Sequence, residues 1–253
     1  MRIPRLLALL LTLSVVAMSP AAVAQSTEQL IEQGNAALSA GKYTEAESIW
    51  RRVIEINPKN AIGYNNLGAV MLAQGKLEEA IAAFRQTIQL NPKNAIAYNN
   101  LGSTLSEQGK LEEAIATFRQ AIQIDPKYAK SYYNLGIVLF KQRKLDEAIA
   151  AFRQAIQLDP KFVIAYNNLG STLFEQGKLE EAIATFRQAI QIDPKNAIGY
   201  YNLGFTLHQQ GKLEEAIKEY KQAIALDPKF MPAQTNLKEA ERQRAATKEL
   251  ASG

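Results

Sequence analysis

A proline recurs every 34 residues along most of this chain. The six positions are Pro58, Pro92, Pro126, Pro160, Pro194 and Pro228. A fixed interval of this length marks one structural unit copied end to end. In register with the prolines, the units are residues 27–60, 61–94, 95–128, 129–162, 163–196 and 197–230. Because the array repeats, its function is expected on a surface shared by the units rather than in a single catalytic pocket.

Each unit is predicted to contain two helices. In the third unit, apolar residues recur at intervals of three and four around Tyr98 and Leu101, then around Ala114 and Phe118 after a Gln-Gly-Lys turn. This spacing places them on one face of a helix. The second helix is expected to end at Asp125, because a following proline disfavours helical geometry at the residue before it.

Glycine stands in the middle of the predicted first helix, where it costs about 0.5 to 1 kcal/mol relative to alanine. In the third unit this residue is Gly102. We expect the cost to be offset by close approach of the paired helix at its own small residue, Ala114. The bulky core between units is predicted to come from Tyr98, Phe118 and the equivalent aromatic residues of the other units.

The order of tyrosine, Leu-Gly, leucine, alanine, phenylalanine, alanine and proline at these offsets resembles the tetratricopeptide-repeat family over residues 27–230. The resemblance implies an all-α fold, a right-handed α-solenoid of antiparallel helix pairs. It also implies that the first helix of each pair lines the concave side of the superhelix.

Both ends of the array depart from the pattern. In residues 27–60, Gln33, Ala37 and Trp50 replace leucine, a larger apolar residue and phenylalanine, so this unit is interpreted as an N-terminal capping repeat. Residues 231–250 have a helical composition, but polar residues stand where tyrosine, glycine and leucine stand elsewhere. Such substitution suits a terminal helix that faces water, and we predict a C-terminal capping helix there.

The first residues have the order of a secretory signal peptide. Arg2 and Arg5 precede an apolar run over residues 6–18, and small residues follow up to Ala24. The run has 13 residues, short of the roughly 20 that a membrane-spanning helix needs; an uncleaved anchor is the alternative. We expect a cleaved signal peptide at residues 1–24 and no stable membrane insertion afterwards. The expected location is the periplasm, or the thylakoid lumen in a photosynthetic source.

In the family that the chain resembles, ligands lie in a groove formed by the second, fifth, sixth, ninth, twelfth and thirteenth residues of each unit. Asparagine fills many of the fifth and sixth positions: Asn65, Asn66, Asn99, Asn100, Asn134, Asn167, Asn168 and Asn202. A carboxamide both donates and accepts hydrogen bonds, so this column is a candidate ladder for the backbone of an extended peptide. The alternative is structural, with the sixth-position asparagines bonding neighbouring helices.

Bulky apolar residues share the groove in the later units. They are Tyr133, Ile137, Phe140, Phe174, Tyr201 and Phe205. Exposed clusters of this kind commonly mark partner sites, and residues covered by neighbouring helices would instead be core. Lys130 is a further candidate, with Lys141 nearby in the same unit, for an acidic residue or a chain terminus of the ligand.

Two of the units are nearly identical. Residues 95–127 and 163–195 differ at only two positions, which indicates a recent internal duplication. The differing pairs are Ala95 against Val163, and Ser106 against Phe174.

The composition argues against catalysis, metal binding and nucleic-acid binding. The chain has no cysteine and one histidine, His208, so the usual zinc ligands and a nucleophile with its base are missing. Without residues 1–24, the chain keeps 27 of its 29 basic residues against 25 acidic ones, a formal balance of +2. This charge is too small to indicate a nucleic-acid partner. The arginine column that includes Arg119 is interpreted as part of a solvated outer face.

These observations predict a non-enzymatic scaffold with no cofactor and no metal. It is expected to bind a peptide or a partner helix in its concave groove, in the assembly or organisation of an exported or envelope complex. Two alternatives stay open: a self-associating structural protein, and a non-catalytic subunit that recruits an envelope enzyme.

Overall fold

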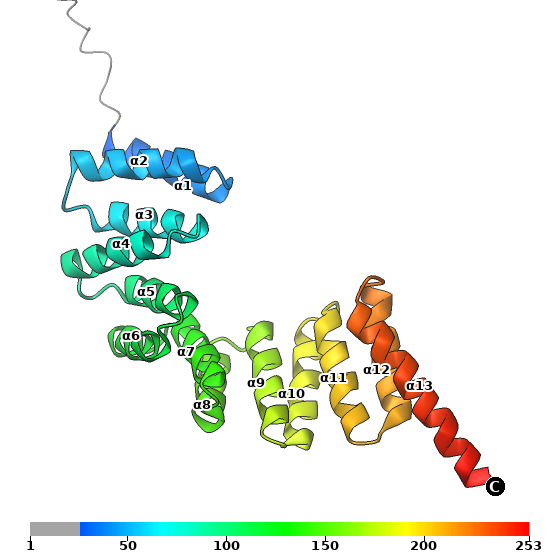
Figure 1. Ribbon diagram of the computed structural model, residues 1–253. Coiled ribbons are helices and arrows are strands. Elements are labelled where there is room, and N and C mark those ends of the chain that lie inside the picture. Colours follow the sequence, from blue (N-terminus) through cyan, green and yellow to red (C-terminus); the bar gives the residue numbers. More distant parts are fainter. Residues whose placement is uncertain (1–25, 253) are drawn as a thin grey trace, which may run out of the picture.

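The computed structural model describes residues 26–252, which form helices and the turns between them. This part of the chain has 13 helices and no strand. The helices are α1 (Thr27–Ser39), α2 (Tyr43–Ile56), α3 (Ala61–Ala73), α4 (Leu77–Leu90), α5 (Ala95–Glu107), α6 (Leu111–Ile124), α7 (Ala129–Lys141), α8 (Leu145–Leu158), α9 (Val163–Glu175), α10 (Leu179–Ile192), α11 (Ala197–Gln209), α12 (Leu213–Leu226) and α13 (Met231–Ser252). They form hairpins along a curved array with α1 and α13 at its ends (Figure 1). The predicted all-α solenoid of helix pairs is confirmed, and the signal peptide predicted for residues 1–24 lies outside the described residues.

Local interactions set the ends of the helices in each unit. Asn94 caps α5, because its Oδ1 accepts a hydrogen bond from the backbone N–H of Ala97 at 3.1 Å. Between α5 and α6, Gly109 has a φ of +83°, a left-handed conformation that glycine adopts without strain. Helix α6 then ends before Asp125, which is extended because a proline follows it.

An aromatic ring seated on a glycine holds the two helices of each unit together. In the third unit, a Cβ added to Gly102 would lie 2.8 Å from the ring of Phe118, which is 1% exposed. The other pairs are Gly34 with Trp50, Gly68 with Phe84, Gly136 with Phe152, Gly170 with Phe186 and Gly204 with Tyr220. The paired helix does approach closely, as predicted, but the group that needs the space is the Phe118 ring and not Ala114.

The tyrosines at the fourth position of the units are only half-buried. Tyr98 has this intermediate exposure, and Tyr64 and Tyr200 line shallow pockets beside the second helices. The rings seated on glycine, by contrast, are at most 1% exposed. The prediction that both aromatic columns fill the core between units is therefore corrected: the core contains the rings of the second helices.

The first helices of the pairs lie on the inner side of the curved array. Cα atoms of each first helix come within 8 Å of the next first helix, from α1 and α3 to α11 and α13. Within residues 26–252, no two successive second helices approach each other this closely. The units are therefore closest together on the side of the first helices, which makes that side concave. We call it the inner surface.

Long side chains bridge the wider gap between successive second helices. Arg119 of α6 pairs with Glu147 of α8 at 3.0 Å, and Arg153 of α8 pairs with Glu181 of α10 at 2.8 Å. Equivalent pairs join Arg51 with Glu79, Arg85 with Glu113 and Arg187 with Glu215. At this exposure each pair contributes at most about 1 kcal/mol. The arginine column is exposed, as predicted, and it is also paired from unit to unit.

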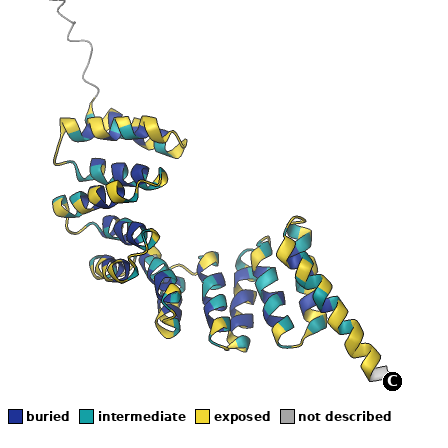
Figure 2. Cartoon of the chain, viewed as in Figure 1, coloured by how far each residue is buried: buried dark blue, intermediate teal, exposed yellow. Residues whose placement is uncertain are grey.

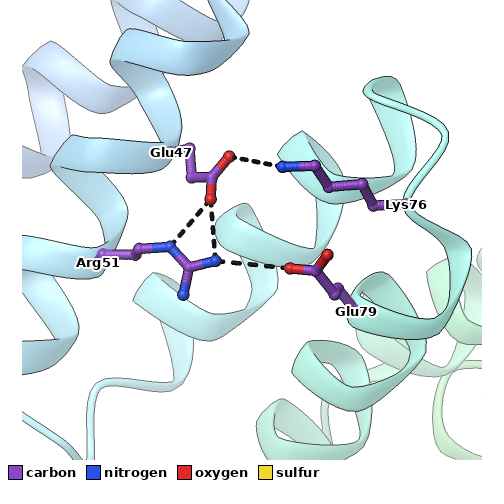
Figure 3. Close-up of polar contacts among 4 residues, drawn as sticks. All are labelled: Glu47, Arg51, Lys76 and Glu79. Carbon is purple, nitrogen blue, oxygen red and sulfur yellow. Dashed lines mark hydrogen bonds and ion pairs between the residues drawn. The ribbon is translucent and has the colours of Figure 1, made fainter.

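A larger cluster of ion pairs joins the divergent first unit to the second. Glu47 on α2 accepts hydrogen bonds from Nε and Nη2 of Arg51 at 3.0 and 2.9 Å, and from Nζ of Lys76 at 3.1 Å (Figure 3). Arg51 also pairs with Glu79 of α4 at 3.5 Å. The bonds from Arg51 lower the pKa of Glu47, partial burial opposes this, and Lys76 lowers the pKa further.

Helix α13 packs on α12 in the position of a further first helix. Ala240 is 0% exposed, and Leu237 packs, partly buried, against the core. Arg244 pairs with Glu214 of α12 at 3.2 Å. Residues 245–250 of α13 are exposed to solvent (Figure 2). Its polar residues thus cover the end of the array, while Leu237 and Ala240 pack inward.

Gly102→Ala is expected to destabilise the chain by about 2 kcal/mol, because the added Cβ overlaps a buried ring that cannot move freely. Phe118→Leu removes the ring, so the loss in the double variant should be smaller than the sum of the two single losses. Urea unfolding followed by circular dichroism measures all three variants. Strictly additive losses would contradict the seating of the ring on the glycine.

Candidate functional site

Side-chain hydrogen bonds run along the inner surface from unit to unit. The sixth-position asparagine of one unit donates through Nδ2 to the fifth-position side chain of the preceding unit. The distances are 3.3 Å from Asn100 to Asn65, 3.0 Å from Asn134 to Asn99, 3.1 Å from Asn168 to the Tyr133 hydroxyl, and 3.2 Å from Asn236 to the Tyr201 hydroxyl. Asn66 donates to Asn35 of the first unit at 3.4 Å. These bonds give the sixth-position asparagines a structural role between neighbouring helices.

Two of the predicted site residues are buried. Asn99 is 1% exposed and accepts hydrogen bonds from both Ser131 and Asn134. Asn167 is 7% exposed, and its Nδ2 donates to the carbonyl oxygen of Val163 at 3.3 Å. The expectation that these fifth-position carboxamides face a ligand is corrected, because both side chains are packed between helices.

Asn202 is the exception among the sixth-position asparagines. Its carboxamide has no hydrogen-bond partner among the described residues, and only its backbone carbonyl accepts a bond, from Thr206. The acceptor that the pattern assigns to it, Asn167 Oδ1, is buried without a partner. Gly199 also stands where the fourth unit has Ser131, so a second donor to this acceptor is missing. The ladder is therefore open between the fifth and sixth units.

The predicted apolar residues surround two adjoining pockets on α7, α9 and α11. The first pocket has a volume of about 280 Å³ and is lined by Ile137, Phe140, Lys141, Phe152, Asn168, Ser171 and Thr172. The second has a volume of about 240 Å³ and is lined by Phe140, Ser171, Phe174, Glu175, Phe186, Tyr201, Asn202, Phe205 and Thr206. Phe140 and Ser171 belong to both linings, so the pockets form one continuous apolar stretch of the inner surface.

Ring contacts hold the walls of the second pocket in place. The ring centroids of Phe174 and Phe205 lie 5.4 Å apart, and those of Tyr201 and Phe205 lie 6.2 Å apart. Aromatic pairs at these separations are favourable. The pocket is thus preformed by packing among its own residues. The rings of Phe140, Phe174, Tyr201 and Phe205 are half-buried, and the ring of Phe186 is 1% exposed.

The other predicted site residues lie outside the pockets. Tyr133 is half-buried, its ring centroid lies 4.9 Å from that of Phe162, and burial raises the pKa of its hydroxyl. Lys130 is exposed and lines neither pocket. Lys141, which the sequence analysis placed with Lys130 as a contact for an acidic group, lines the first pocket. Ser171, which the sequence analysis did not select, lines both pockets. Ser171 is the ninth residue of its unit, a groove position of the family pattern, so that pattern could have identified it.

His208 connects the last unit to the terminal helix. Its Nε2 lies 3.0 Å from Oε1 of Gln243 on α13, and its Nδ1 lies 3.4 Å from the hydroxyl of Tyr220. Burial raises the pKa of Tyr220. No group of three or more His, Cys, Asp or Glu residues within the described part of the chain could hold a metal ion.

A sequence model of the family described as the cilia and flagella-associated protein 70 C-terminal domain matches residues 8–250. The chain belongs to this tetratricopeptide-repeat family. Comparison with curated protein sequences gave no significant match.

Solved tetratricopeptide-repeat structures resemble the chain over most of its length. YrrB, whose structure is described as that of a TPR protein with an unusual peptide-binding site, is 28% identical with a TM-score of 0.62 over 75% of this chain and 97% of YrrB. MamA is also 28% identical, with a TM-score of 0.59 over 65% of this chain and 96% of MamA. PilF of Pseudomonas aeruginosa is 22% identical, with a TM-score of 0.73 over 84% of this chain and 97% of PilF. The likeness to PilF shows the fold alone.

Asn134→Ala is expected to destabilise the chain by about 1 kcal/mol, because it leaves the buried Asn99 with one donor fewer. Asn202→Ala removes a carboxamide without a partner, so its effect should stay within about 0.5 kcal/mol. The midpoints of urea unfolding of the two variants provide the comparison. Equal losses would show that Asn202 does take part in the ladder.

Proposed function

We propose that this chain is a non-enzymatic protein-interaction scaffold that binds a peptide segment or a helix of a partner protein on its inner surface. The observation that carries the proposal is the pair of adjoining apolar pockets on α7, α9 and α11. Concave apolar sites with a few polar groups are the usual form of a binding site. The peptide-binding site named for YrrB, which shares 28% identity and the repeat fold, supports the same use of the array here.

The whole inner surface is suited to a chain-like ligand. Four units have an isoleucine at the second position that is 51 to 56% exposed. These are Ile62 on α3, Ile96 on α5, Ile164 on α9 and Ile198 on α11, whereas α7 has the exposed Lys130 at this position. Together with the pockets, they form an apolar track that is longer than a small molecule needs. A peptide or an amphipathic helix can contact several units of such a track at once.

We also propose that the scaffold works after export, in an envelope or lumenal complex. The charged, apolar and small-residue order of residues 1–24 supports this proposal. None of the described helices combines the length and the apolar character that a membrane span requires. The periplasm is the proposed location, or the thylakoid lumen if the source is photosynthetic.

Blocking the inner surface should abolish partner capture. In the groove variant, Ile96, Ile164 and Ile198 are each changed to Glu, which adds charge at exposed positions without touching the core. The mature chain, immobilised and incubated with the exported fraction of its source, should retain specific proteins that this variant loses at least about tenfold.

The matched control adds the same three charges to the outer side, at Ala116, Ala150 and Ala184 on the second helices, which are also exposed. This outer variant should retain the partners of the parent chain. If the groove variant retains them all, or if both variants lose them equally, the inner surface is not the binding site.

A further inference from the structure

The two nearly identical units provide an internal comparison that locates the specificity of the inner surface. Residues 95–127 and 163–195 share every residue but two. One difference, Ala95 against Val163, is at the first residue of the first helix. The other places Phe174 where the earlier copy has Ser106. The last residue of the unit also differs, Tyr128 against Asn196, but it lies outside the first helix, just before α7 and α11. Phe174 is therefore the groove residue that distinguishes the inner surface of the fifth unit from that of the third.

Phe174 is part of the wall of the second pocket. It lies there with Phe140, Tyr201 and Phe205, and its ring packs on Phe205 at 5.4 Å. The units that follow the two copies also differ in the groove. At the ninth position, the sixth unit has Phe205 and the fourth unit has Ile137. The second pocket therefore differs from the corresponding surface beside the third unit at two groove positions, those of Phe174 and Phe205.

The wall of the second pocket also contains a polar group, the carboxamide of Asn202. Asn134 follows the third unit and donates both to Asn99 at 3.0 Å and to Ser103 at 3.3 Å. Asn202 has the equivalent position in the sixth unit. The fifth unit keeps Asn167 and Ser171 in place of Asn99 and Ser103. The carboxamide of Asn202 nevertheless has no hydrogen-bond partner among the described residues. One donor and one acceptor therefore stand unused at the edge of an apolar pocket, which is the pair of groups that a peptide backbone requires.

Each of the two pockets has room for a bulky side chain. Their volumes of about 280 and 240 Å³ lie below the roughly 300 to 1,000 Å³ of typical small-molecule sites. They share Phe140 and Ser171, so two occupants would be neighbours. Lys141 borders the first pocket, is exposed and has no ion pair within the described residues.

We propose that the fifth-unit region is a selective site for a peptide segment with two bulky apolar side chains, one in each pocket. Asn202 hydrogen-bonds the peptide backbone beside the second side chain, and Lys141 favours an acidic residue beside the first. Phe174 sets the selectivity of the site. This inference rests on the proposed function, because it assumes that the inner surface binds peptides.

The test starts from a displayed library of short random peptides selected on the immobilised mature chain. We expect the selected peptides to share two bulky apolar residues, with an acidic residue near one of them. Fluorescence anisotropy of labelled selected peptides then gives Kd values for single variants. Phe174→Ser, which restores the residue of the earlier copy, should raise Kd at least about tenfold, and Asn202→Ala about three- to tenfold.

Two matched variants serve as controls. Ser106→Phe makes the reverse exchange in the third unit, and Asn134→Ala removes the paired equivalent of Asn202; both should leave Kd unchanged. Circular dichroism melting checks that Phe174→Ser is folded. Asn202→Ala supplies a second variant, which breaks no side-chain hydrogen bond within the described residues.

The outcomes separate this inference from the proposed function. If peptides bind and the groove variant with three glutamates abolishes their binding, while Phe174→Ser and Asn202→Ala bind as tightly as the parent, the inner surface binds peptides but the selective site is refuted. Selected peptides without a pair of apolar residues would refute it as well. If no peptide is selected, or if binding survives the groove variant, the proposed function fails together with the inference.

Discussion

The contact between an aromatic ring and a glycine within each hairpin is the interaction on which the rest of the structure depends. Because the ring of Phe118 occupies the space that a Cβ on Gly102 would need, the two helices of the unit pack in one close arrangement. The same contact occurs in six hairpins, including the divergent first unit, where the ring belongs to Trp50. A repeated hairpin geometry leads to a repeated step between units, and a regular curved array follows.

Because the array is curved, different side chains connect successive units on its inner and outer sides. Successive first helices approach within 8 Å between Cα atoms, so short carboxamide side chains such as Asn134 and Asn99 can bond across them. Successive second helices are farther apart and are bridged by longer arginine and glutamate side chains. Where the inner ladder is open, at Asn202, the surface also has its aromatic pocket. The candidate site is thus a local departure from the pattern that holds the array together.

The sequence was sufficient to predict the helices and the turns between them, because the proline interval and the apolar spacing are local properties. It did not predict which atoms meet across the repeat. The period places Asn99 and Asn100 side by side on a helix, but only the approach of the next helix decides that Asn99 is buried. Likewise, the need for Gly102 was evident, whereas its contact with the ring of Phe118 depends on the packing of the pair. Five of the six bulky apolar groove residues chosen from the sequence line the two pockets, and Tyr133 does not.

The decisive measurement is a crystal structure of residues 25–253 with a bound peptide. We expect the peptide to lie along the inner surface, with one apolar side chain between Phe174 and Phe205 and a backbone group hydrogen-bonded to Asn202. A peptide bound against the second helices, or at either end of the array, would contradict it.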